Sequence, residues 1–376
     1  MATTPARFER RNGDRGAGYD ERGALCQTSH HNDNFQTERN LMRSIKIMPG
    51  GILALALFAG TATAEPVKIR VAWTVAVANW ASLLLEKKDL AQHLGKSYVF
   101  EPVHYAGTPL MITAMATGDL EIGDLAYSTL ALAIENAGMD DMKVIGDDFQ
   151  DGVGGNYSNE YFVLQDSPIK KVEDLKGQVI ATNAAGSAVD IAMRAMLRQH
   201  GLEDKRDYTM VEATFPTMAA MLTGKKAALI PGVIPFSLNP DFRNTARVLF
   251  TQKAAIGPTQ MIVFTARKSF IDKNRAALVD MMEDMVRIVR WYLDPANHKE
   301  AVAIAARLTK QPPERFDPWL FTAKDYYRDP DLKPNLTSLQ ANIATQKQLG
   351  FIKSEIDVKK YADLSIIEEA AKRLKQ

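Results

Sequence analysis

The sequence predicts an α/β protein built from two lobes, and three observations lead to this prediction. The chain has 376 residues, which is more than one small module needs. From Val67 onward, short apolar runs alternate with helical patterns, as is typical of α/β layers with mostly parallel strands. Residues 109–118 and 216–224 share a pattern with Pro at the helix start, Met two residues later and Thr-Gly at the end. Two lobes of similar build would produce this repeat, and so would two independently converged amphipathic helices.

Composition excludes several classes of protein. The 46 Lys and Arg residues nearly balance the 45 Asp and Glu residues, whereas nucleic-acid-binding proteins show a basic excess. The single cysteine, Cys26, argues against a disulfide scaffold, a C-x-x-C redox motif and a cysteine zinc site. The six histidines of the chain show no H-x-x-x-H or H-x-H spacing, and phosphate- or dinucleotide-binding glycine motifs are absent from the sequence. We therefore expect no metal, no cofactor and no nucleic acid partner.

A secretory signal peptide is predicted over residues 42–64. Arg43 and Lys46 precede the apolar run at 51–60, and Ala62-Thr-Ala64 supplies an A-x-A cleavage site. The run is shorter than the roughly 20 apolar residues that cross a bilayer. A buried core helix is the alternative, but it does not explain the A-x-A boundary. We expect residues 1–41 to be an upstream segment, with translation starting at Met42, or a cleaved leader.

Removal of the leader would change the net charge of the chain very little. Cleavage after Ala64 leaves 312 residues, without cysteine and with 38 basic and 39 acidic side chains. The expected product is a periplasmic protein exported by a cleavable signal peptide.

Hydrophobic periodicity and turn residues predict the order of the elements. Glycines end most of the expected helices, and Pro109 follows Thr108 at a helix start, where its missing N–H costs nothing. The expected strands are 67–73, 98–103, 120–125, 160–164, 178–182, 227–230 and 259–265. The expected helices are 80–94, 109–118, 126–138, 187–201, 216–224, 273–291 and a last helical region from 337.

The predicted organisation places two crossings between the lobes. Residues 147–159 hold acidic side chains and three glycines, which favours a long loop beside the first crossing. The strands 160–164 and 259–265 are the expected crossing strands. The predicted domains are a leader at 1–64 with the signal at 42–64, lobe I at 65–159 and 262–376, and lobe II at 160–261.

One stretch resembles a known family. It reads Val172-Glu-Asp-Leu-Lys-Gly-Gln-Val-Ile-Ala-Thr-Asn-Ala-Ala-Gly-Ser-Ala-Val-Asp190. This is similar to the E-D-L-K-G-K strand and following G-S loop of periplasmic solute-binding proteins of the nitrate, sulfonate and taurine type of ABC transporter. The similarity runs over roughly residues 66–365. Residues 227–235, which contain no acidic residue, depart from the acidic G-x-I-D-A step that is common in the family.

The resemblance implies a type II periplasmic binding protein. Members have two α/β lobes joined by two crossing strands, close on a ligand in the interlobe cleft and deliver it to an ABC permease. The expected function is capture of a small organic anion, a sulfonate or carboxylate that can be aromatic, by a monomer without enzymatic activity. An enzyme of the same fold, such as a thiamine-pyrimidine synthase or a menaquinone-pathway enzyme, is the alternative, and a signal peptide argues against it. A ligand-sensing domain of a regulator would need a helix-turn-helix in front, and residues 1–64 contain none.

Candidate ligand-binding residues follow from the architecture. Parallel α/β lobes bind ligands at the carboxyl ends of strands, where helix N-termini present unpaired N–H groups that suit an anion without any arginine. Small or hydroxyl residues at four such points, with nearby aromatic residues able to stack on the ligand, give the candidates Trp73, Thr74, Asn79, Trp80, Gly107, Thr108, Tyr127, Ser128, Thr129, Tyr157, Asn183, Gly186, Ser187 and Pro216.

Each candidate also has a purely structural interpretation. A Ser or Thr at a helix start is often only a cap, and an aromatic residue after a first strand is often part of the core. Tyr157, in a glycine-rich segment, could simply be solvated.

Overall fold

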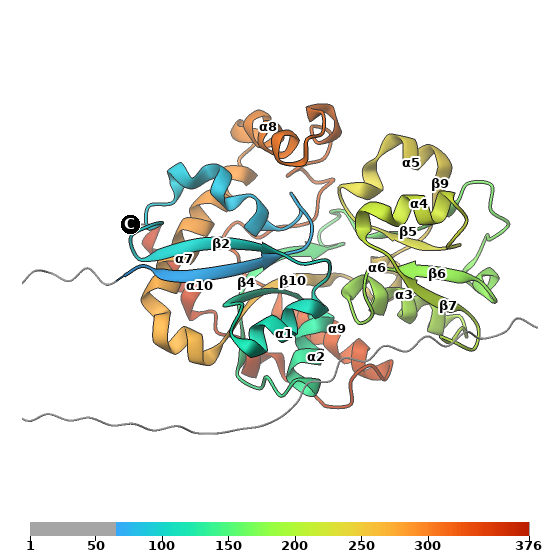
Figure 1. The fold of residues 1–376 in the computed structure, drawn as a ribbon, viewed down its shortest axis with the longest axis horizontal. Helices are drawn as coiled ribbons and strands as arrows, with labels where there is room; N and C mark the ends of the chain where they lie inside the picture. Colours follow the sequence, from blue (N-terminus) through green and yellow to red (C-terminus); the bar gives the residue numbers. More distant parts are fainter. Residues whose placement is uncertain (1–64, 376) are drawn as a thin grey trace, which may run out of the picture. The chain divides into compact units, whose positions relative to one another are not determined.

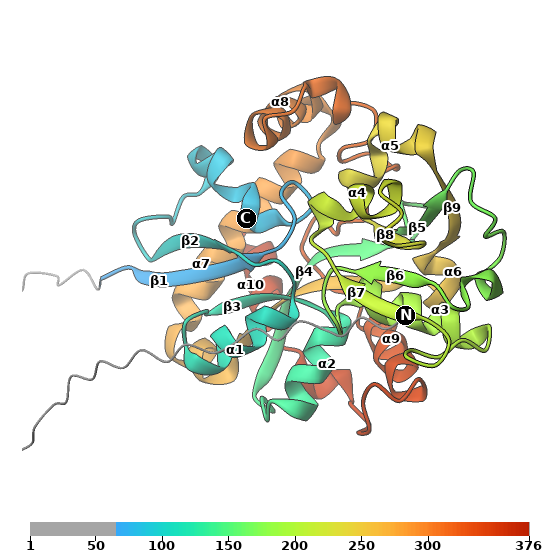
Figure 2. The ribbon, with the colours of Figure 1, turned by 45° about the vertical axis from the view of Figure 1, so that its right-hand side comes forward.

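The computed structural model describes residues 65–375 (Figure 1). The predicted signal peptide, the segment before it, Cys26 and Gln376 lie outside this range. The described residues form strands and helices in an alternating order, as the sequence predicts, in three sheets with helices around them. The prediction of mostly parallel strands is wrong, because four of the seven strand pairings among these residues are antiparallel. Figures 1 and 2 show the elements from β5 to α6 gathered in one lobe, and the earlier and later elements in the other.

The first lobe contains a five-stranded sheet in the order β2-β1-β3-β10-β4. Its first three members run parallel, while β10 is antiparallel to both of its neighbours. The strands are β1 (Val67–Trp73), β2 (Tyr98–His104), β3 (Ile122–Ala126), β4 (Met142–Asp151) and β10 (Thr259–Arg267).

Helices cover both faces of this sheet. Because successive residues of a strand point to opposite faces, Val71 and Ala72 belong to two different hydrophobic clusters. The helices of the lobe are α1 (Pro109–Thr117), α2 (Tyr127–Asn136), α7 (Lys268–Leu293), α8 (His298–Thr309), α9 (Leu336–Gln348) and α10 (Ser365–Arg373). The predicted helix at 80–94 consists instead of two short 3₁₀ helices, Trp80–Ser82 and Leu84–Leu90, the second kinked at Lys87.

The second lobe contains two smaller sheets. The order β8-β5-β9 is antiparallel throughout, whereas β6 and β7 pair in parallel. A bridge between Ile180 and Leu229 connects the two sheets. The strands of the second lobe are β5 (Glu160–Leu164), β6 (Val179–Thr182), β7 (Thr209–Glu212), β8 (Ile230–Gly232) and β9 (Ala246–Thr251). The helices of this lobe are α3 (Ala188–Gln199), α4 (Met218–Thr223), α5 (Pro240–Thr245) and α6 (Gln252–Ile256).

The helices that share the repeated pattern, α1 and α4, lie one in each lobe. The chain enters the second lobe between β4 and β5 and returns between α6 and β10. The strands expected to cross between the lobes form as β5 and β10, but each pairs within one lobe, so the chain crosses in the segments just before them. The exact lobe boundaries remain a prediction.

The long loop expected at 147–159 is wrong in its first part. The strand β4 continues to Asp151, and Asp147, Asp148 and Asp151 on it are fully buried. Buried carboxyl groups need hydrogen-bond partners, and these come from distant segments that the local sequence does not reveal. Asp147, for example, accepts hydrogen bonds from the Gln260 side chain and from the Asp329 backbone N–H.

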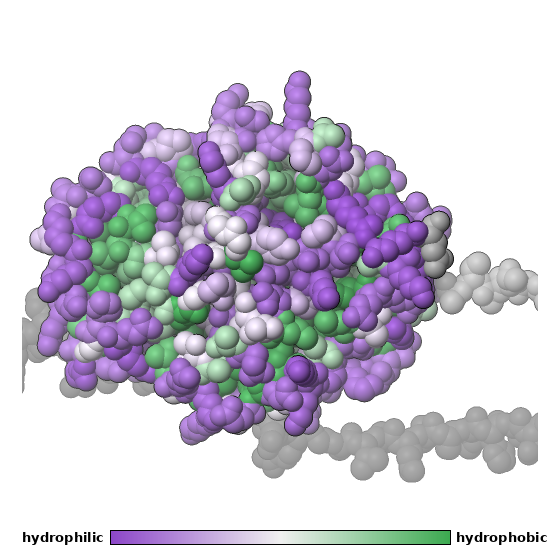
Figure 3. Space-filling model, turned by 180° about the vertical axis from the view of Figure 1, so that it is seen from behind, coloured by the Kyte–Doolittle hydropathy of each residue, from purple (hydrophilic) through white to green (hydrophobic). Residues whose placement is uncertain are grey.

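Large apolar side chains on the surface are scattered rather than continuous. The face in Figure 3 shows hydrophobic patches interrupted by hydrophilic side chains. The exposed large apolar side chains of the described residues are Leu85, Val99, Leu110, Val179 and Phe236. Within residues 65–375, no helix combines the length and the apolar character that a membrane crossing requires.

Trp80 lies in the core of the first lobe. Its side chain is 0% exposed and stacks on Phe321, with ring centroids 5.4 Å apart and planes 10° apart. The guanidinium of Arg328 lies 5.2 Å from the Trp80 ring centre. Trp80 therefore belongs to the core of the first lobe, where its contact with Arg328 adds a cation–π contribution.

We expect Trp80→Ala to lower the free energy of unfolding by ~3–5 kcal/mol, because it leaves a large cavity in a packed core. Urea denaturation followed by circular dichroism measures this loss. Trp73→Ala is the matched control, since Trp73 is partly exposed and packs on the His104 ring at 4.5 Å. Equal losses in the two variants would contradict the assignment of Trp80 to the core.

Candidate ligand-binding site

A small cavity lies between the two lobes. Its volume is ≈ 40 Å³, and about 10–15 Å³ suffices for one water-sized group, so it has room for about three. The first lobe contributes Thr74, Val75, Ala78, Asn79, Thr108, Ala126, Phe149, Met261, Ile262 and Tyr326. The second lobe contributes Asn183, Ser187, Ala188, Val189, Phe215, Val233 and Ile234.

Three helix N-termini meet at this cavity. The residues that precede α1, α2 and α3 are Thr108, Ala126 and Ser187, and all three line it. The first N–H groups of a helix have no partner within the helix, and the helix dipole gives that end a partial positive charge. The cavity therefore combines a positive potential with hydroxyl and amide side chains.

None of the described residues that line the cavity carries a formal charge. Its polar side chains are Thr74, Asn79, Thr108, Asn183 and Ser187, all of which the sequence predicted as candidates. The Ser187 hydroxyl donates to Asn183 Oδ1 at 2.7 Å, and Thr108 Oγ1 lies 2.7 Å from Thr129 Oγ1. An anion here would be held by dipoles rather than by an ion pair.

A second set of candidates lies where the lobes touch beside the cavity. The Ser128 hydroxyl donates to the Gly186 carbonyl across the lobes at 2.9 Å, and the Tyr127 hydroxyl lies 3.5 Å from the Ala188 carbonyl. A Cβ on Gly107 would lie 3.2 Å from Asn183 Nδ2 and from Ala184 Cβ.

At Gly186, an added Cβ would lie 2.9 Å from Leu132 Cδ1, and its φ of +78° also favours glycine. The two glycines thus let the lobes approach closely.

The remaining candidates are not brought to the cavity. Trp73 packs on His104, and Trp80 is in the core. The Tyr157 hydroxyl lies 2.7 Å from Ser237 Oγ, outside the cavity lining, so Tyr157 is not simply solvated. Pro216 lines a neighbouring groove. Local sequence indicates that an aromatic residue follows a strand, but not which side of the sheet its ring faces.

Apolar residues that the sequence interpretation missed form much of the wall. Phe149 and Tyr326 stack with ring centroids 4.3 Å apart, and the Tyr326 hydroxyl donates to Asn159 Oδ1 at 2.5 Å. Val233 and Ile234 come from the segment that departs from the family's acidic step. The departure from the acidic step could have drawn attention to Val233 and Ile234 as wall residues. Tyr326, in contrast, follows no recognisable motif in the sequence.

Asn79 connects the cavity wall to buried carboxyl groups. Its Oδ1 accepts hydrogen bonds from the N–H groups of Thr74 (3.1 Å) and Val75 (2.8 Å). Its Nδ2 donates to Asp124 Oδ2 at 2.7 Å and to Asp148 Oδ2 at 2.6 Å. Burial raises the pKa of Asp124 and of Asp148, and their mutual repulsion further raises that of Asp124. A carboxyl pair this close is best accommodated by one shared proton.

Arg328 supplies a buried positive charge beside this pair. It forms an ion pair with Asp325 at 3.0 Å and donates to the Ala78 carbonyl at 2.8 Å. The rings of Trp80, Phe149, Phe321 and Tyr326 lie around its guanidinium. Arg328 is not among the residues that line the cavity, but it holds the carbonyl of Ala78, which is, and it thereby stabilises the wall.

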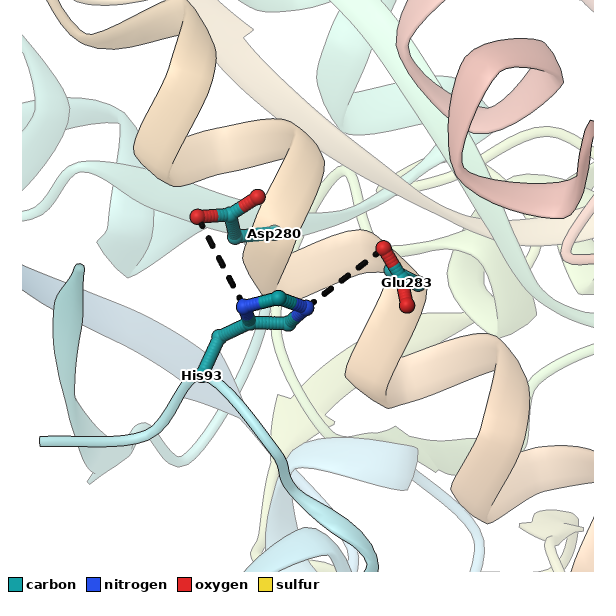
Figure 4. A group of neighbouring side chains, drawn as sticks. All are labelled: His93, Asp280 and Glu283. Carbon is teal, nitrogen blue, oxygen red and sulfur yellow. Dashed lines mark ion pairs between the residues drawn. The ribbon is translucent and has the colours of Figure 1, made fainter. Parts of the chain in front are cut away.

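A separate cluster contains ligand types that can bind metals. His93 faces Asp280 and Glu283 of α7, with Nδ1–Oδ2 and Nε2–Oε2 distances of 3.8 and 3.5 Å (Figure 4). Arg373 pairs with Asp280 at 2.8 Å, and Arg287 pairs with Glu283 at 2.6 Å. A cation would have to compete with both guanidinium groups. The cluster is therefore an ion-pair network that links α7 and α10 to the segment before β2.

The two-lobed architecture is the fold of type II periplasmic binding proteins. Solved structures support this class: the alkanesulfonate-binding protein from Xanthomonas axonopodis pv. citri bound to MOPS has a TM-score of 0.61 at 15% identity, covering 80% of this chain and 99% of that one. The nitrate-binding protein from Synechocystis PCC 6803 has a TM-score of 0.63 at 14% identity, covering 82% and 89%. The desulfurization enzyme DSZB has a TM-score of 0.57 at 12% identity, covering 82% and 99%. At these identities the likeness shows the fold.

The chain belongs to the NMT1-like family, whose model matches residues 62–306. A protein of Escherichia coli (strain K12) named for binding aliphatic sulfonates is 27% identical over 177 residues. That alignment covers 46% of this chain and 51% of the relative, so the chain spans about half of its length. The resemblance to solute-binding proteins and the predicted fold class are confirmed.

The buried carboxyl groups of β4 predict a pH-dependent stability. Burial raises the pKa of Asp147 to about 8 and that of Asp151 to about 7, whereas both titrate near ~4 when unfolded. Between those values the folded protein holds more protons, so the free energy of unfolding falls as pH rises. The fall is up to about 1.4 kcal/mol per pH unit and group, and it is complete above pH ~8.

Urea denaturation between pH 5 and 8 measures this dependence, and Asp147→Asn should reduce its slope. The slope, rather than the absolute stability, is the relevant value, because the amide also changes hydrogen bonding. Asp272→Asn, at an exposed ion pair with Lys268, should leave the slope unchanged. A stability that rises with pH in this window would show that these carboxyl groups are ionised in the folded state.

Proposed function

We propose that this protein is the substrate-binding component of an ABC importer, which captures a small organic anion between its lobes and delivers it to the permease. The ligand class is a sulfonate or carboxylate, including aromatic ones. The observation that supports the proposal best is the convergence of three helix N-termini on one cavity. Thr108, Ala126 and Ser187 precede α1, α2 and α3, and all line that cavity.

The chemistry of the wall supports an anionic head group. Thr74, Thr108 and Ser187 place hydroxyl groups in the wall, and Asn79 and Asn183 place amides there. Thr74 and Ser187 donate to the two asparagines, and Asn79 donates to Asp124 and Asp148. In our proposal the Asn183 amide and the helix N–H groups are therefore the main donors to the anion. Oriented N–H and O–H donors stabilise an anion without the desolvation cost of a buried ion pair. The shared proton at Asp124 and Asp148 would reduce the negative charge behind the wall.

The contacts between the lobes support binding by closure. The Ser128–Gly186 and Tyr127–Ala188 contacts are made next to the cavity and join different lobes. In our proposal these contacts form when the hinge closes, so that the closed shape signals occupancy to the permease. The protein would act as a periplasmic monomer after removal of residues 1–64, with lobe I at 65–159 and 262–376 and lobe II at 160–261.

An enzyme of the same fold remains the competing hypothesis, because a desulfurization enzyme shares the architecture. The described cavity lining contains no His, Lys, Cys, Asp or Glu. Ser187 donates its hydroxyl hydrogen to Asn183, which is not a base. General acid–base or activated-nucleophile chemistry needs such groups within hydrogen-bond reach of the substrate, so the lining favours reversible binding.

We expect Ser187→Ala to weaken anion binding about three- to tenfold, because it removes the hydroxyl that holds the Asn183 amide in the cavity wall. Isothermal titration calorimetry with alkanesulfonates, taurine, nitrate, benzoate and phthalate measures the change. The variant should stay folded, at a cost of about 1 kcal/mol, since Ser187 also caps α3.

Thr251→Ala is the matched control, because Thr251 caps α6 in the same way but lies outside the cavity lining. It should cost similar stability and leave affinity unchanged. Equal affinities of the wild type and Ser187→Ala would remove Ser187 from the site. Conversion of a bound anion into product would favour the enzyme hypothesis.

A further inference from the structure

A second hollow, larger than the cavity, opens beside it. Its volume is ≈ 360 Å³, against ≈ 40 Å³ for the cavity. Both lobes line it: Ala76 and residues of the 309–316 segment come from the first lobe, and residues 215–242 contribute the rest. We call this hollow the apolar groove.

The groove and the cavity are continuous in their walls. Phe215 and Val233 line both of them. Residues that are adjacent in the sequence also line different hollows. Val75 lines the cavity and Ala76 the groove, and in the same way Ile234 lines the cavity and Pro235 the groove. Only one layer of side chains therefore separates the two spaces.

The groove wall suits hydrocarbon. Its apolar members include Pro216, Pro231, Phe236, Phe242 and Phe316. Three of its polar members already have partners within the protein, since Ser237 lies 2.7 Å from the Tyr157 hydroxyl, Asn239 accepts from the Asp241 N–H and Thr309 donates to the Ala305 carbonyl.

The remaining polar members are Gln311 and Arg315, which come from the 309–316 segment. Most of the surface offered to a ligand is therefore apolar.

We propose that the apolar groove binds the body of the transported ligand while the cavity binds its anionic head. The proposal rests on the function proposed above and specifies its substrate class: an amphiphilic anion with an aliphatic or aromatic body, rather than nitrate or another compact ion. The cavity matches the size of a sulfonate or carboxylate group alone. A ligand that ended there would leave the adjoining apolar surface in contact with water.

Affinity should then rise with the length of the ligand. Burial of one methylene group contributes about a fourfold gain in affinity. Titration calorimetry of the purified protein with methane-, butane-, hexane- and octanesulfonate, and with the matching carboxylates, measures this slope. We expect an increase of about fourfold per methylene until the groove is filled.

Two neighbouring alanines on α4 provide a matched pair of variants. Ala219 lines the groove, whereas Ala220 is exposed and does not. Ala219→Phe places a ring in the groove and should reduce the dependence on chain length, while the shortest bound anion keeps its affinity. Ala220→Phe adds the same ring to the same helix outside the groove and should keep the wild-type slope.

The outcomes separate the two proposals. Binding of short anions with no dependence on length, or an unchanged slope in Ala219→Phe, would overturn the groove assignment and leave the anion site intact. Binding of none of the sulfonates or carboxylates would overturn the proposed function itself, and the groove assignment with it.

Discussion

The amide of Asn79 is the interaction on which the rest of the site depends. Its oxygen accepts from the Thr74 and Val75 N–H groups, and its nitrogen donates to Asp124 and Asp148. One side chain thus ties the first loop after β1 to both β3 and β4. Since Thr74, Val75 and Ala78 line the cavity, while Ala76 lines the groove, the same amide positions one wall of both hollows.

The carboxyl pair behind Asn79 connects this wall to the core. Asp148 also accepts from the Trp80 N–H at 2.9 Å, so the start of the 3₁₀ helix at Trp80–Ser82 is fixed to β4. Trp80 in turn packs under Arg328, which holds the carbonyl of Ala78. Buried polar groups of this kind specify one arrangement because each has its partner only there. The loop after β1 is therefore held in one arrangement by buried partners from the first lobe.

Local chemistry made part of this arrangement predictable. Thr108, Asn183 and Ser187 could be found because helix starts have recognisable residues, and the strand–helix alternation predicted that each lies at the carboxyl end of a strand in its own lobe. Contacts between distant segments could not be found in this way. Tyr326 and Phe149 are ordinary apolar or aromatic residues in sequence, and only the fold brings them together at one wall.

The errors have the same physical origin. The polar pattern from Asp147 to Asn159 is typical of a loop, but the partners of Asp147 are Gln260 and Asp329, more than a hundred residues away. Trp80 and Asn79 are adjacent, yet one side chain faces the core and the other the cavity. Neither distinction can be derived from a neighbouring residue.

The absence of formal charge from the described cavity lining has a consequence for the conditions of capture. Attraction between separated ions is screened over about 8 Å at physiological ionic strength, whereas short contacts with fixed dipoles inside a closed cavity are hardly screened. Residues 65–376 contain 38 basic and 39 acidic side chains, so long-range steering of an anion would be weak as well. Uptake through such a receptor would proceed almost equally well in fresh and in saline surroundings.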